Sequence, residues 1–364
     1  MSRLRVAILF GGRSAEHEVS LLSARNVFLA LDRDRFEPIL IGIDRSGRWL
    51  SQPESLLLTA VGDPRNAHLV DNGRDVSLSP REGGGLTSAT ESQPVDVVFP
   101  VLHGPMGEDG TVQGLLELAG LPYVGAGVLG SAVGMDKDVM KRLLHDAGLP
   151  ITPFRALRQF DFDRDPAAVC ARAAEVGFPL FTKPANLGSS VGVRRVDNAA
   201  ELRAAIAHAF EFDTKALAEA AVVGREIEIA VLGNDDPIAS VAGEIEVRHK
   251  DGFYSYDAKY IDESGAILKI PVELPVKTLA TMQKLALDAF SCLECAGMAR
   301  VDFFLRTDGT AVLNEINTIP GFTAISMYPK LWEASGIKPR ALVTRLLELA
   351  LERHARRTKL ASKK

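Results

Sequence analysis

The sequence predicts a mixed α/β protein, and three observations lead to this fold class. The run "LRVAILFGG" near the amino terminus is apolar and breaks into glycines, as a buried strand does before a turn. Residues 16–31 then have a helical pattern, and "FEPILIGI" returns as a second strand. The run "VDVVFPVLHG" is a further buried strand, and it precedes a helix at 111–119 that ends at Gly120.

Length and composition indicate more than one domain. The chain has 364 residues, of which 46% are hydrophobic, so it can bury more than one core. We expect a first domain at 1–134, with a variable, loop-rich insertion at 51–94 that holds at most short strands. A second domain is expected at 135–223 and a third at 224–364.

Charge and hydropathy exclude two classes of partner. The net charge of −5 leaves no basic footprint for nucleic acid. No apolar run approaches the roughly 20 residues of a membrane span, and no signal-peptide pattern precedes the first strand. We therefore expect a cytoplasmic protein that binds neither nucleic acid nor a membrane.

Cys292 and Cys295 form a C-x-x-C pair in a predicted helix and are interpreted as buried thiols, with zinc or redox use as the alternative.

The stretch "ARVDFFLRTDGTAVLNEINTIPGF" predicts a β-hairpin, because Asp308 and Gly309 form a strong turn signal between two apolar-rich runs. A two-residue loop would place Asp302 opposite Glu315 on one face. The same register adds Arg300 opposite Asn317 and Phe304 opposite Leu313 to that face, and it gives the other face to Val301, Phe303, Leu305, Val312, Asn314 and Ile316. A three-residue bulged loop would break this register.

Two carboxylates directly opposite on a sheet repel each other unless something compensates their charge. A divalent cation would do so, because carboxylate and amide oxygens hold magnesium beside a nucleotide, with phosphate oxygens and water completing the shell. Asp302, Glu315 and Asn317 are therefore candidate metal ligands. The alternative is a solvated hairpin face on which the acids pair with Arg300 or with lysines.

A second hairpin is rich in glycine. The stretch "FPLFTKPANLGSSVGVRRV" predicts strands at 179–183 and 191–196 around a loop that holds Gly188, Ser189, Ser190 and Gly192. Backbone N–H groups in such a loop can approach a phosphate closely. The G-K-[ST] sequence and the following helix of a Walker A loop are missing, so an ordinary hairpin remains the alternative.

Charged residues outside the two hairpins suggest a nucleotide. Lys183 at the base of the glycine-rich loop, Lys137 at a helix start and Lys259 in "YSYDAKY" could supply cations for phosphoryl transfer. Glu219 ends a predicted edge strand and Glu226 opens the next, and such acids can receive an adenine amino group and a ribose hydroxyl. Taken singly, each of these residues is equally a solvated surface charge.

The order of these features, lysine, glycine-rich hairpin, acids, lysine and acid hairpin, resembles the ATP-grasp pattern. From about Val6 to Trp332 the chain resembles the D-alanine:D-alanine ligase family. The motifs that carry the resemblance are "GGRSAEHEVS", "HGPMGEDGT", "MDK", "KPANLGSSVG", "GREIEIAVLG", "YDAKY", "RVDFF" and "NEINTIPGFT". The resemblance implies a three-domain ATP-grasp fold with an amino-terminal Rossmann-like (pre-ATP-grasp) domain.

The resemblance also implies an activity. Such a ligase uses ATP to phosphorylate the carboxylate of one D-alanine, and the amine of a second D-alanine then attacks the acyl phosphate, which yields a peptidoglycan precursor. Two Mg²⁺ ions would assist, with Mn²⁺ as an alternative metal, and a homodimer is expected. The alternatives are a D-alanine:D-lactate ligase, which makes an ester with the same residues, and a catalytically inactive nucleotide-binding homologue.

Site residues follow from the same resemblance. The metal ligands would be Asp302, Glu315 and Asn317. The nucleotide would contact Lys137, Phe181, Lys183, Gly188, Ser189, Ser190, Glu219, Ala220, Val222, Glu226, Phe253, Lys259, Phe304, Asn314 and Glu315. Some members have Lys at the position of Ala220 and Leu at that of Met327.

The resemblance further implies two substrate subsites. The first D-alanine would lie at Glu16 and His103, and the second at Ser326 and Met327. The catalytic residues would be Arg300 and the Gly321 N–H as an oxyanion hole, together with a triad of Glu16, Ser189 and Tyr260. The segment "FYSYDAKYIDESG" is expected to act as a lid, because it is aromatic and glycine-flanked.

Overall fold

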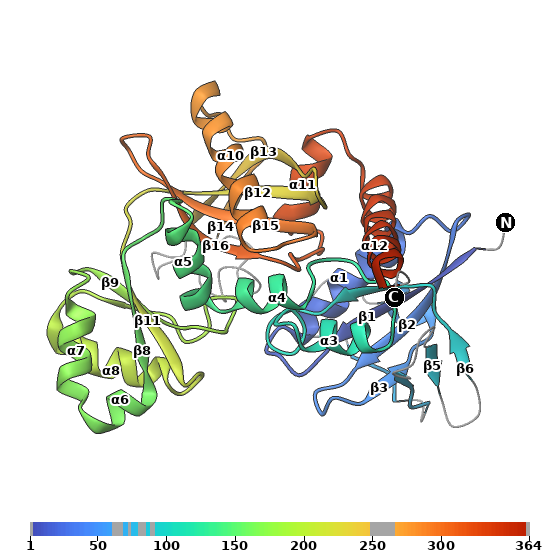
Figure 1. Cartoon of the computed structure of the whole chain (residues 1–364), viewed down its shortest axis with the longest axis horizontal. Helices are drawn as coiled ribbons and strands as arrows, with labels where there is room; N and C mark the ends of the chain where they lie inside the picture. Colours follow the sequence, from blue (N-terminus) through green and yellow to red (C-terminus); the bar gives the residue numbers. More distant parts are fainter. Residues whose placement is uncertain are drawn as a thin grey trace.

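The amino-terminal part of the chain forms a mainly parallel sheet. The computed structural model describes residues 3–59, 68–71, 74–78, 85–87, 92–247 and 266–361. Its first sheet has the order β3-β2-β1-β7 (Figure 1). The elements are β1 (Leu4–Gly11), α1 (His17–Ala30), β2 (Phe36–Ile43), β3 (Trp49–Ser51) and β7 (Val97–Val101). Strand β1 pairs in parallel with both β2 and β7 and is buried along most of its length, which explains its continuous apolar sequence.

Small elements follow β3 in the segment that we expected to be loop-rich. They are α2 (Glu54–Thr59), β4 (Ser77–Leu78), β5 (Gly85–Thr87) and β6 (Ser92–Pro94). The three strands form a sheet of their own in the order β4-β5-β6. Across the described ranges, no helix is long and apolar enough to cross a membrane.

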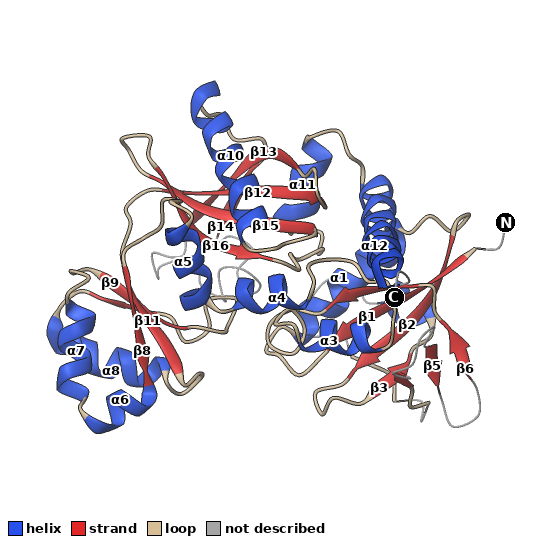
Figure 2. Ribbon diagram, viewed as in Figure 1, coloured by secondary structure: helices blue, strands red, loops and turns tan. Residues whose placement is uncertain are grey.

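A second, antiparallel sheet has the order β10-β9-β11-β8. Its strands are β8 (Phe154–Arg158), β9 (Leu180–Pro184), β10 (Arg194–Val196) and β11 (Lys215–Ala220). Helices α6 (Gln159–Arg164), α7 (Pro166–Ala174) and α8 (Ala199–Ala209) lie beside the sheet (Figure 2) and share an apolar core with it. The expectation that Glu219 ends an edge strand was wrong, because β11 lies between β9 and β8.

The third sheet has five strands in the order β14-β13-β12-β15-β16. They are β12 (Arg225–Gly233), β13 (Ile238–Val247), β14 (Ala266–Lys269), β15 (Gly297–Leu305) and β16 (Ala311–Asn317). Helix α10 (Val276–Cys292) packs on one face, against Ile229, Val231 and Val301 among others. Helices α11 (Met327–Ala334) and α12 (Pro339–Ala361) share a core with Ala230, Leu232 and Met298 on the other face.

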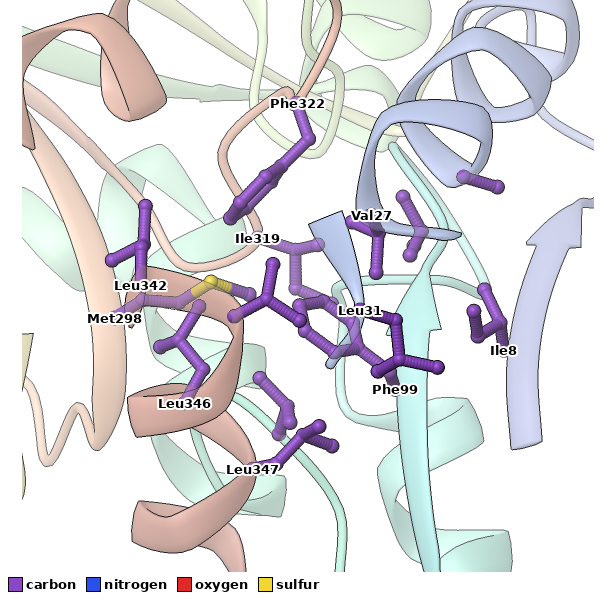
Figure 3. Packing of buried hydrophobic residues seen from close by; sticks show 14 of the residues in the cluster. Ile8, Val27, Leu31, Phe99, Met298, Ile319, Phe322, Leu342, Leu346 and Leu347 are labelled. Carbon is purple, nitrogen blue, oxygen red and sulfur yellow. The ribbon is translucent and has the colours of Figure 1, made fainter. Parts of the chain in front are cut away.

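The core around α12 joins the first and third sheets. Figure 3 shows members of this one cluster: Ile8 and Phe99 of the first sheet, Leu31, Met298 of β15 and Leu346 of α12. Three further helices, α3 (Thr111–Leu118), α4 (Val128–Met135) and α5 (Lys137–Asp146), follow the first sheet and lead towards the other two (Figure 1).

The predicted hairpin is formed by β15 and β16, and its register is partly as expected. Asp302 lies opposite Glu315 and Arg300 opposite Asn317, as predicted. The pairing of Phe304 with Leu313 was wrong, because Phe304 lies opposite Val312. Consequently Leu313 joins the core with Phe303, and Val312 shares the face of Phe304.

Two local irregularities explain this result. The loop is one residue longer than a two-residue turn, since the Arg306 N–H donates to the Thr310 carbonyl and Gly309 has a positive φ of 83°. A shift of register between Asp302 and Phe303 then gives β16 an extra residue at Asn314. The two one-residue offsets cancel at the acid pair, and only the distal half of the hairpin departs from the prediction.

Candidate active site

Segments from all three larger sheets line one cavity. The loops after β1 and β7 contribute from the first sheet, the glycine-rich loop from the second, and β12, β15 and β16 from the third. The polar lining residues are Glu16, His103, Glu108, Ser189, Glu228, Arg300, Glu315, Asn317, Thr323 and Ser326.

The acid pair carries its own compensating cations. The Arg300 guanidinium donates from Nε to Asp302 Oδ1 at 2.7 Å and from Nη2 to Asp302 Oδ2 at 2.7 Å. Asn317 Nδ2 donates to Asp302 Oδ2 at 3.0 Å, and Lys137 Nζ lies 3.4 Å from Glu315 Oε2. The repulsion between the two carboxylates is therefore offset by cations from the same face and from α5. The contacts of the expected alternative, acids paired with Arg300 and with a lysine, are thus present in the structure.

The donor set suits a magnesium ion held next to phosphate. Asp302, Glu315 and Asn317 present hard oxygens from two adjacent strands. Across the part of the chain that the structure describes, no group of three or more His, Cys, Asp or Glu side chains could cage a metal. Two carboxylates and an amide fit a metal that takes its remaining ligands from substrate phosphates and water, which is how magnesium is usually bound beside nucleotides.

The glycine-rich loop is held in an unusual backbone conformation. Ser189 and Ser190 both have positive φ, 51° and 59°, which is uncommon for residues other than glycine and marks functional loops. The Ser189 hydroxyl donates to the Glu16 carboxylate, so the loop contacts the segment before α1. A Cβ at Gly188 would lie 3.1 Å from Glu16 Oε2, so glycine permits this close approach.

Helix α5 contacts the glycine-rich loop, the acid pair and Glu219. It begins at Lys137 because the Asp136 side chain caps it, accepting from the N–H groups of Asp138 and Val139. Lys137 Nζ donates to the Leu187 carbonyl at 2.7 Å in addition to facing Glu315. One turn further along the helix, Lys141 Nζ lies 2.9 Å from Glu219 Oε2.

Lys141 was not predicted as a site residue. Its side chain is fully buried, donates to Thr152 Oγ1 at 2.9 Å, and shares the Glu219 carboxylate with Lys183, whose Nζ lies 3.0 Å away. Burial lowers the pKa of Lys141 to about 8, against the opposing effect of Glu219. Burial would raise the pKa of Glu219, but the two ammonium groups outweigh it and lower that pKa. The helical spacing of the sequence could have indicated that Lys141 is buried, because it falls on the buried stripe of α5 with Met140 and Leu144.

The remaining predicted nucleotide residues form cross-strand pairs in the second and third sheets. Phe181 lies opposite Glu219 on β9 and β11, and Phe304 lies opposite Glu226 on β15 and β12. Ala220 ends β11 with Val222 two residues beyond, and Asn314 is the extra residue of β16. Phe253, Lys259 and Tyr260, and with them the predicted lid, lie outside the described residues.

His103 is a buried, neutral link between the first and third sheets. Nδ1 lies 3.1 Å from the Ile319 carbonyl, which only accepts, so Nδ1 carries the proton and donates. Nε2 then accepts from the Ser23 hydroxyl at 3.1 Å, and the Ser23 oxygen accepts from the Phe322 N–H. Burial lowers the pKa of His103, which agrees with a neutral ring. His103, which we expected beside the first substrate, thus also holds the loop that contains Gly321 in place through these hydrogen bonds.

The loop after β16 brings Gly321, Ser326 and Met327 to the same cavity. A Cβ at Gly321 would lie 2.7 Å from Ser326 Oγ, so only glycine fits this turn without displacing the serine. The Ser326 hydroxyl accepts from the Thr323 N–H at 3.0 Å, and Ser326 immediately precedes α11. Met327 is buried and packs against Gly243. A helix N-terminus at this place suits a carboxylate.

Two further acids in the cavity were missed as site residues. Burial and the nearby Glu16 carboxylate raise the pKa of Glu108 to about 8, and its Oε1 accepts from the Gly104 N–H at 2.9 Å. Glu228 lies opposite Asp302 on β12. Its signal was present in "GREIEIAVLG", because residues two apart on a strand share a face and Glu226 had been selected.

These features define a class of protein. Three larger sheets meet at one cavity, with a glycine-rich loop and an acid-bearing hairpin on its walls. Lysines of α5 and β9 pair with Glu315 and Glu219, and this arrangement is an ATP-grasp fold.

Comparisons with known proteins narrow the class. Residues 5–126 match the family description "D-ala D-ala ligase N-terminus", and residues 143–348 match "D-ala D-ala ligase C-terminus". The chain therefore belongs to the D-alanine–D-alanine ligase family.

Individual relatives agree over their full lengths. The chain is 52% identical to D-alanine–D-alanine ligase A of Chromobacterium violaceum, covering 97% of this chain and 96% of that protein. It is 50% identical to the Escherichia coli (strain K12) ligase A, with 98% of each chain covered.

Solved structures agree as well. The D-alanine-D-alanine ligase from Coxiella burnetii superposes with a TM-score of 0.84 at 38% identity, covering 99% of this chain and 98% of that one. The VanG D-Ala:D-Ser ligase from Enterococcus faecalis gives a TM-score of 0.84 at 36% identity, over 96% of this chain and all of that one.

Proposed function

We propose that this enzyme joins two D-alanine molecules to D-alanyl-D-alanine, with ATP converted to ADP and phosphate, as a step of peptidoglycan precursor synthesis. The observation that carries the proposal is the meeting of the acid hairpin, Arg300 and the Gly321 loop with the Glu16–Ser189 contact in one cavity. The three predicted units, 1–134, 135–223 and 224–364, would each contribute one wall.

ATP would bind between the second and third sheets. Glu219, held by the ammonium groups of Lys141 and Lys183, would receive the adenine amino group. Phe181 and Phe304 would cover the purine faces together with Phe253, and Glu226 would accept from the ribose. Backbone groups of Ala220 and Val222 and the side chain of Asn314 would complete this adenine pocket.

The phosphates would lie between the glycine-rich loop and the acid pair. N–H groups of Gly188, Ser189 and Ser190 would hold their oxygens, together with the ammonium groups of Lys137, Lys183 and Lys259. Asp302, Glu315 and Asn317 would hold two Mg²⁺ ions, with Mn²⁺ as an alternative metal, and the bound metal neutralises charge on the phosphates. Lys137 Nζ, which lies 3.4 Å from Glu315 Oε2, would be placed to hold phosphate oxygens beside that carboxylate.

In the first step, a carboxylate oxygen of the first D-alanine attacks the γ-phosphorus of ATP and ADP leaves. Glu16 would hold the ammonium group of this D-alanine, and the neutral His103 would lie beside its carboxylate without repelling or attracting it as a full charge. The triad of Glu16, Ser189 and Tyr260 would fix the orientation, and its contact between Ser189 and Glu16 is present in the structure.

In the second step, the amine of the second D-alanine attacks the acyl carbon and phosphate leaves. Charge develops on the former carbonyl oxygen, which Arg300 and the Gly321 N–H would stabilise. Ser326 and Met327 at the start of α11 would hold the second carboxylate.

Release of ADP in the presence of a substrate panel tests the proposal. We expect turnover with D-alanine and far less with L-alanine, D-lactate or D-serine. The proposed function would be wrong if D-alanine failed to stimulate ADP release. If D-lactate or D-serine gave the larger stimulation, that compound and not D-alanine would be the second substrate. Size-exclusion chromatography tests the homodimer, and fractionation of cells tests the proposed cytoplasmic location.

A further inference from the structure

Glu228 has no role in the reaction as proposed above, yet it lies in the row of site carboxylates. Strand β12 pairs with β15, which places Glu228 directly opposite Asp302, and Asp302 in turn lies opposite Glu315. Three carboxylates therefore stand side by side on adjacent strands. The Glu228 side chain is 6% exposed, and burial of a carboxylate at such a place is costly unless a cation is close.

Glu228 contacts the guanidinium group of Arg300. Arg300 Nε lies 3.0 Å from Glu228 Oε2 and 2.7 Å from Asp302 Oδ1. Nε carries one hydrogen, and the structure directs it to Asp302, so the contact with Glu228 is electrostatic in this state. Burial would lower the pKa of Arg300, but Asp302 and Glu228 together raise it.

A metal ion at Asp302 would compete with Arg300. Both Asp302 oxygens accept from the guanidinium, and Oδ2 also accepts from Asn317. Oδ2 already accepts two hydrogen bonds, so a divalent cation on this carboxylate would compete for its lone pairs and would also repel the guanidinium, which weakens the contact between Arg300 and Asp302. The Glu228 carboxylate also lies within reach of Nε.

We propose that Glu228 is a positioning residue that keeps the Arg300 guanidinium in the site when Asp302 binds the metal. The Nε hydrogen turns from Asp302 to Glu228, while the Nη groups become available to the oxygen on which charge develops. The inference rests on the proposed function for the role of Arg300. Two observations do not depend on that function: Glu228 lies opposite Asp302 in the sheet, and both carboxylates contact the Arg300 guanidinium.

The first test compares Glu228→Gln with wild type in the absence of D-alanine, by calorimetric titration of ATP binding at increasing Mg²⁺. In the variant Glu228 no longer offers Arg300 a carboxylate, so the guanidinium depends more strongly on Asp302. Metal binding must then break a stronger pair, and half-saturation should need several-fold more Mg²⁺. With D-alanine present, kcat should fall by roughly 10- to 100-fold, as for other residues that orient a site group, while KM for ATP at saturating Mg²⁺ changes little.

Glu244→Gln is the matched control. Glu244 is a buried acid on β13 that pairs with Arg225 at 2.7 Å, and its cross-strand partner Ile227 places it on the other face of the same sheet. It should leave the Mg²⁺ requirement unchanged. If both variants raised the Mg²⁺ requirement alike, or lost thermal stability and activity alike, Glu228 would be structural and the proposal would fail.

A double-mutant comparison separates positioning from simple charge. In an Arg300→Ala background, Glu228→Gln should shift the Mg²⁺ half-saturation clearly less than it does in wild type, because no guanidinium remains to compete. An equal shift in both backgrounds would mean that Glu228 acts only through its negative charge near the metal, and it would overturn the proposal. These binding readouts need no turnover, so they stay decisive even if D-alanine proves not to be the substrate.

Discussion

At the scale of single residues, the two facing carboxylates of the acid hairpin are expected to lower the stability of the protein. Glu315 faces Asp302 across the hairpin, and Lys137 Nζ, at 3.4 Å from Glu315 Oε2, is too distant for a strong hydrogen bond and offsets only part of the repulsion between the acids. We predict that Glu315→Gln nearly abolishes turnover, while the melting temperature of the metal-free protein stays the same or rises. Steady-state assays at limiting Mg²⁺ and a thermal melt measure both, and wild-type turnover would refute the metal assignment.

Arg300 is expected to act through geometry as well as charge. Its guanidinium makes two parallel contacts to Asp302, and a lysine cannot reproduce that fork. Arg300→Lys should therefore lower kcat far more than it weakens ATP binding. Comparable losses in kcat and in ATP affinity would instead mark Arg300 as a structural ion pair.

Glu108 gives the stability of the protein a pH dependence of definite sign. Burial raises its pKa from 4.5 to about 8, so between these values the folded protein keeps a proton that the unfolded chain has lost. Its contribution to stability is complete at low pH and is lost as pH rises towards 8. Glu108→Gln should remove this decline, so that the free energy of unfolding falls less between about pH 5 and pH 8 than in wild type. Parallel pH profiles would contradict the buried, protonated state.

At the scale of elements, sequence reasoning succeeded where a period or a turn signal was strong. Alternation along 301–305 predicted which side chains face the core, and the register at Asp302 and Arg300 was right. The pairing of Phe304 failed because the loop between Arg306 and Thr310 has three residues rather than two, and the Asp308-Gly309 signal is compatible with either length. The extra residue at Asn314, which no local feature marks, then restores the predicted register at Asp302. Glu219 was placed on an edge because strand order depends on long-range pairing that no local pattern reports.

Helix α5 offers a prediction at this scale, since it connects two sheets through lysines one turn apart. Lys141→Met leaves Glu219 with Lys183 alone, so the carboxylate loses one of two contacts that orient it. KM for ATP should rise roughly tenfold, with a smaller change in kcat. Lys284→Met, on an exposed pair with Asp288 on α10, is the control and should change neither. An unchanged KM for ATP would remove Lys141 from the nucleotide site.

At the scale of the whole molecule, α12 fastens the first sheet to the third. Arg353 on this helix donates to the Tyr123 carbonyl at 3.0 Å and to the Gly125 carbonyl, and it stacks on the Tyr123 ring. No feature of the sequence predicted this contact, because the two segments are far apart in the chain. The site depends on it, since the first sheet positions Glu16 and His103 while the third positions Arg300.

Arg353→Met should lower the free energy of unfolding by about 1–3 kcal/mol, because two carbonyls lose their donor. Arg345→Met on the same helix breaks only exposed ion pairs and should stay within about 0.5 kcal/mol of wild type. Urea denaturation measures both variants. Equal effects would show that α12 is held by its apolar core alone.

The central claim is that the enzyme forms an acyl phosphate of D-alanine and resolves it with a second D-alanine. Isotope transfer tests it most directly: D-alanine labelled with ¹⁸O in its carboxylate is incubated with ATP and Mg²⁺, and the products are analysed by mass spectrometry. We predict one ¹⁸O in each phosphate released, with ADP and D-alanyl-D-alanine formed in equal amounts. Phosphate without label, or ADP release without dipeptide, would contradict the account.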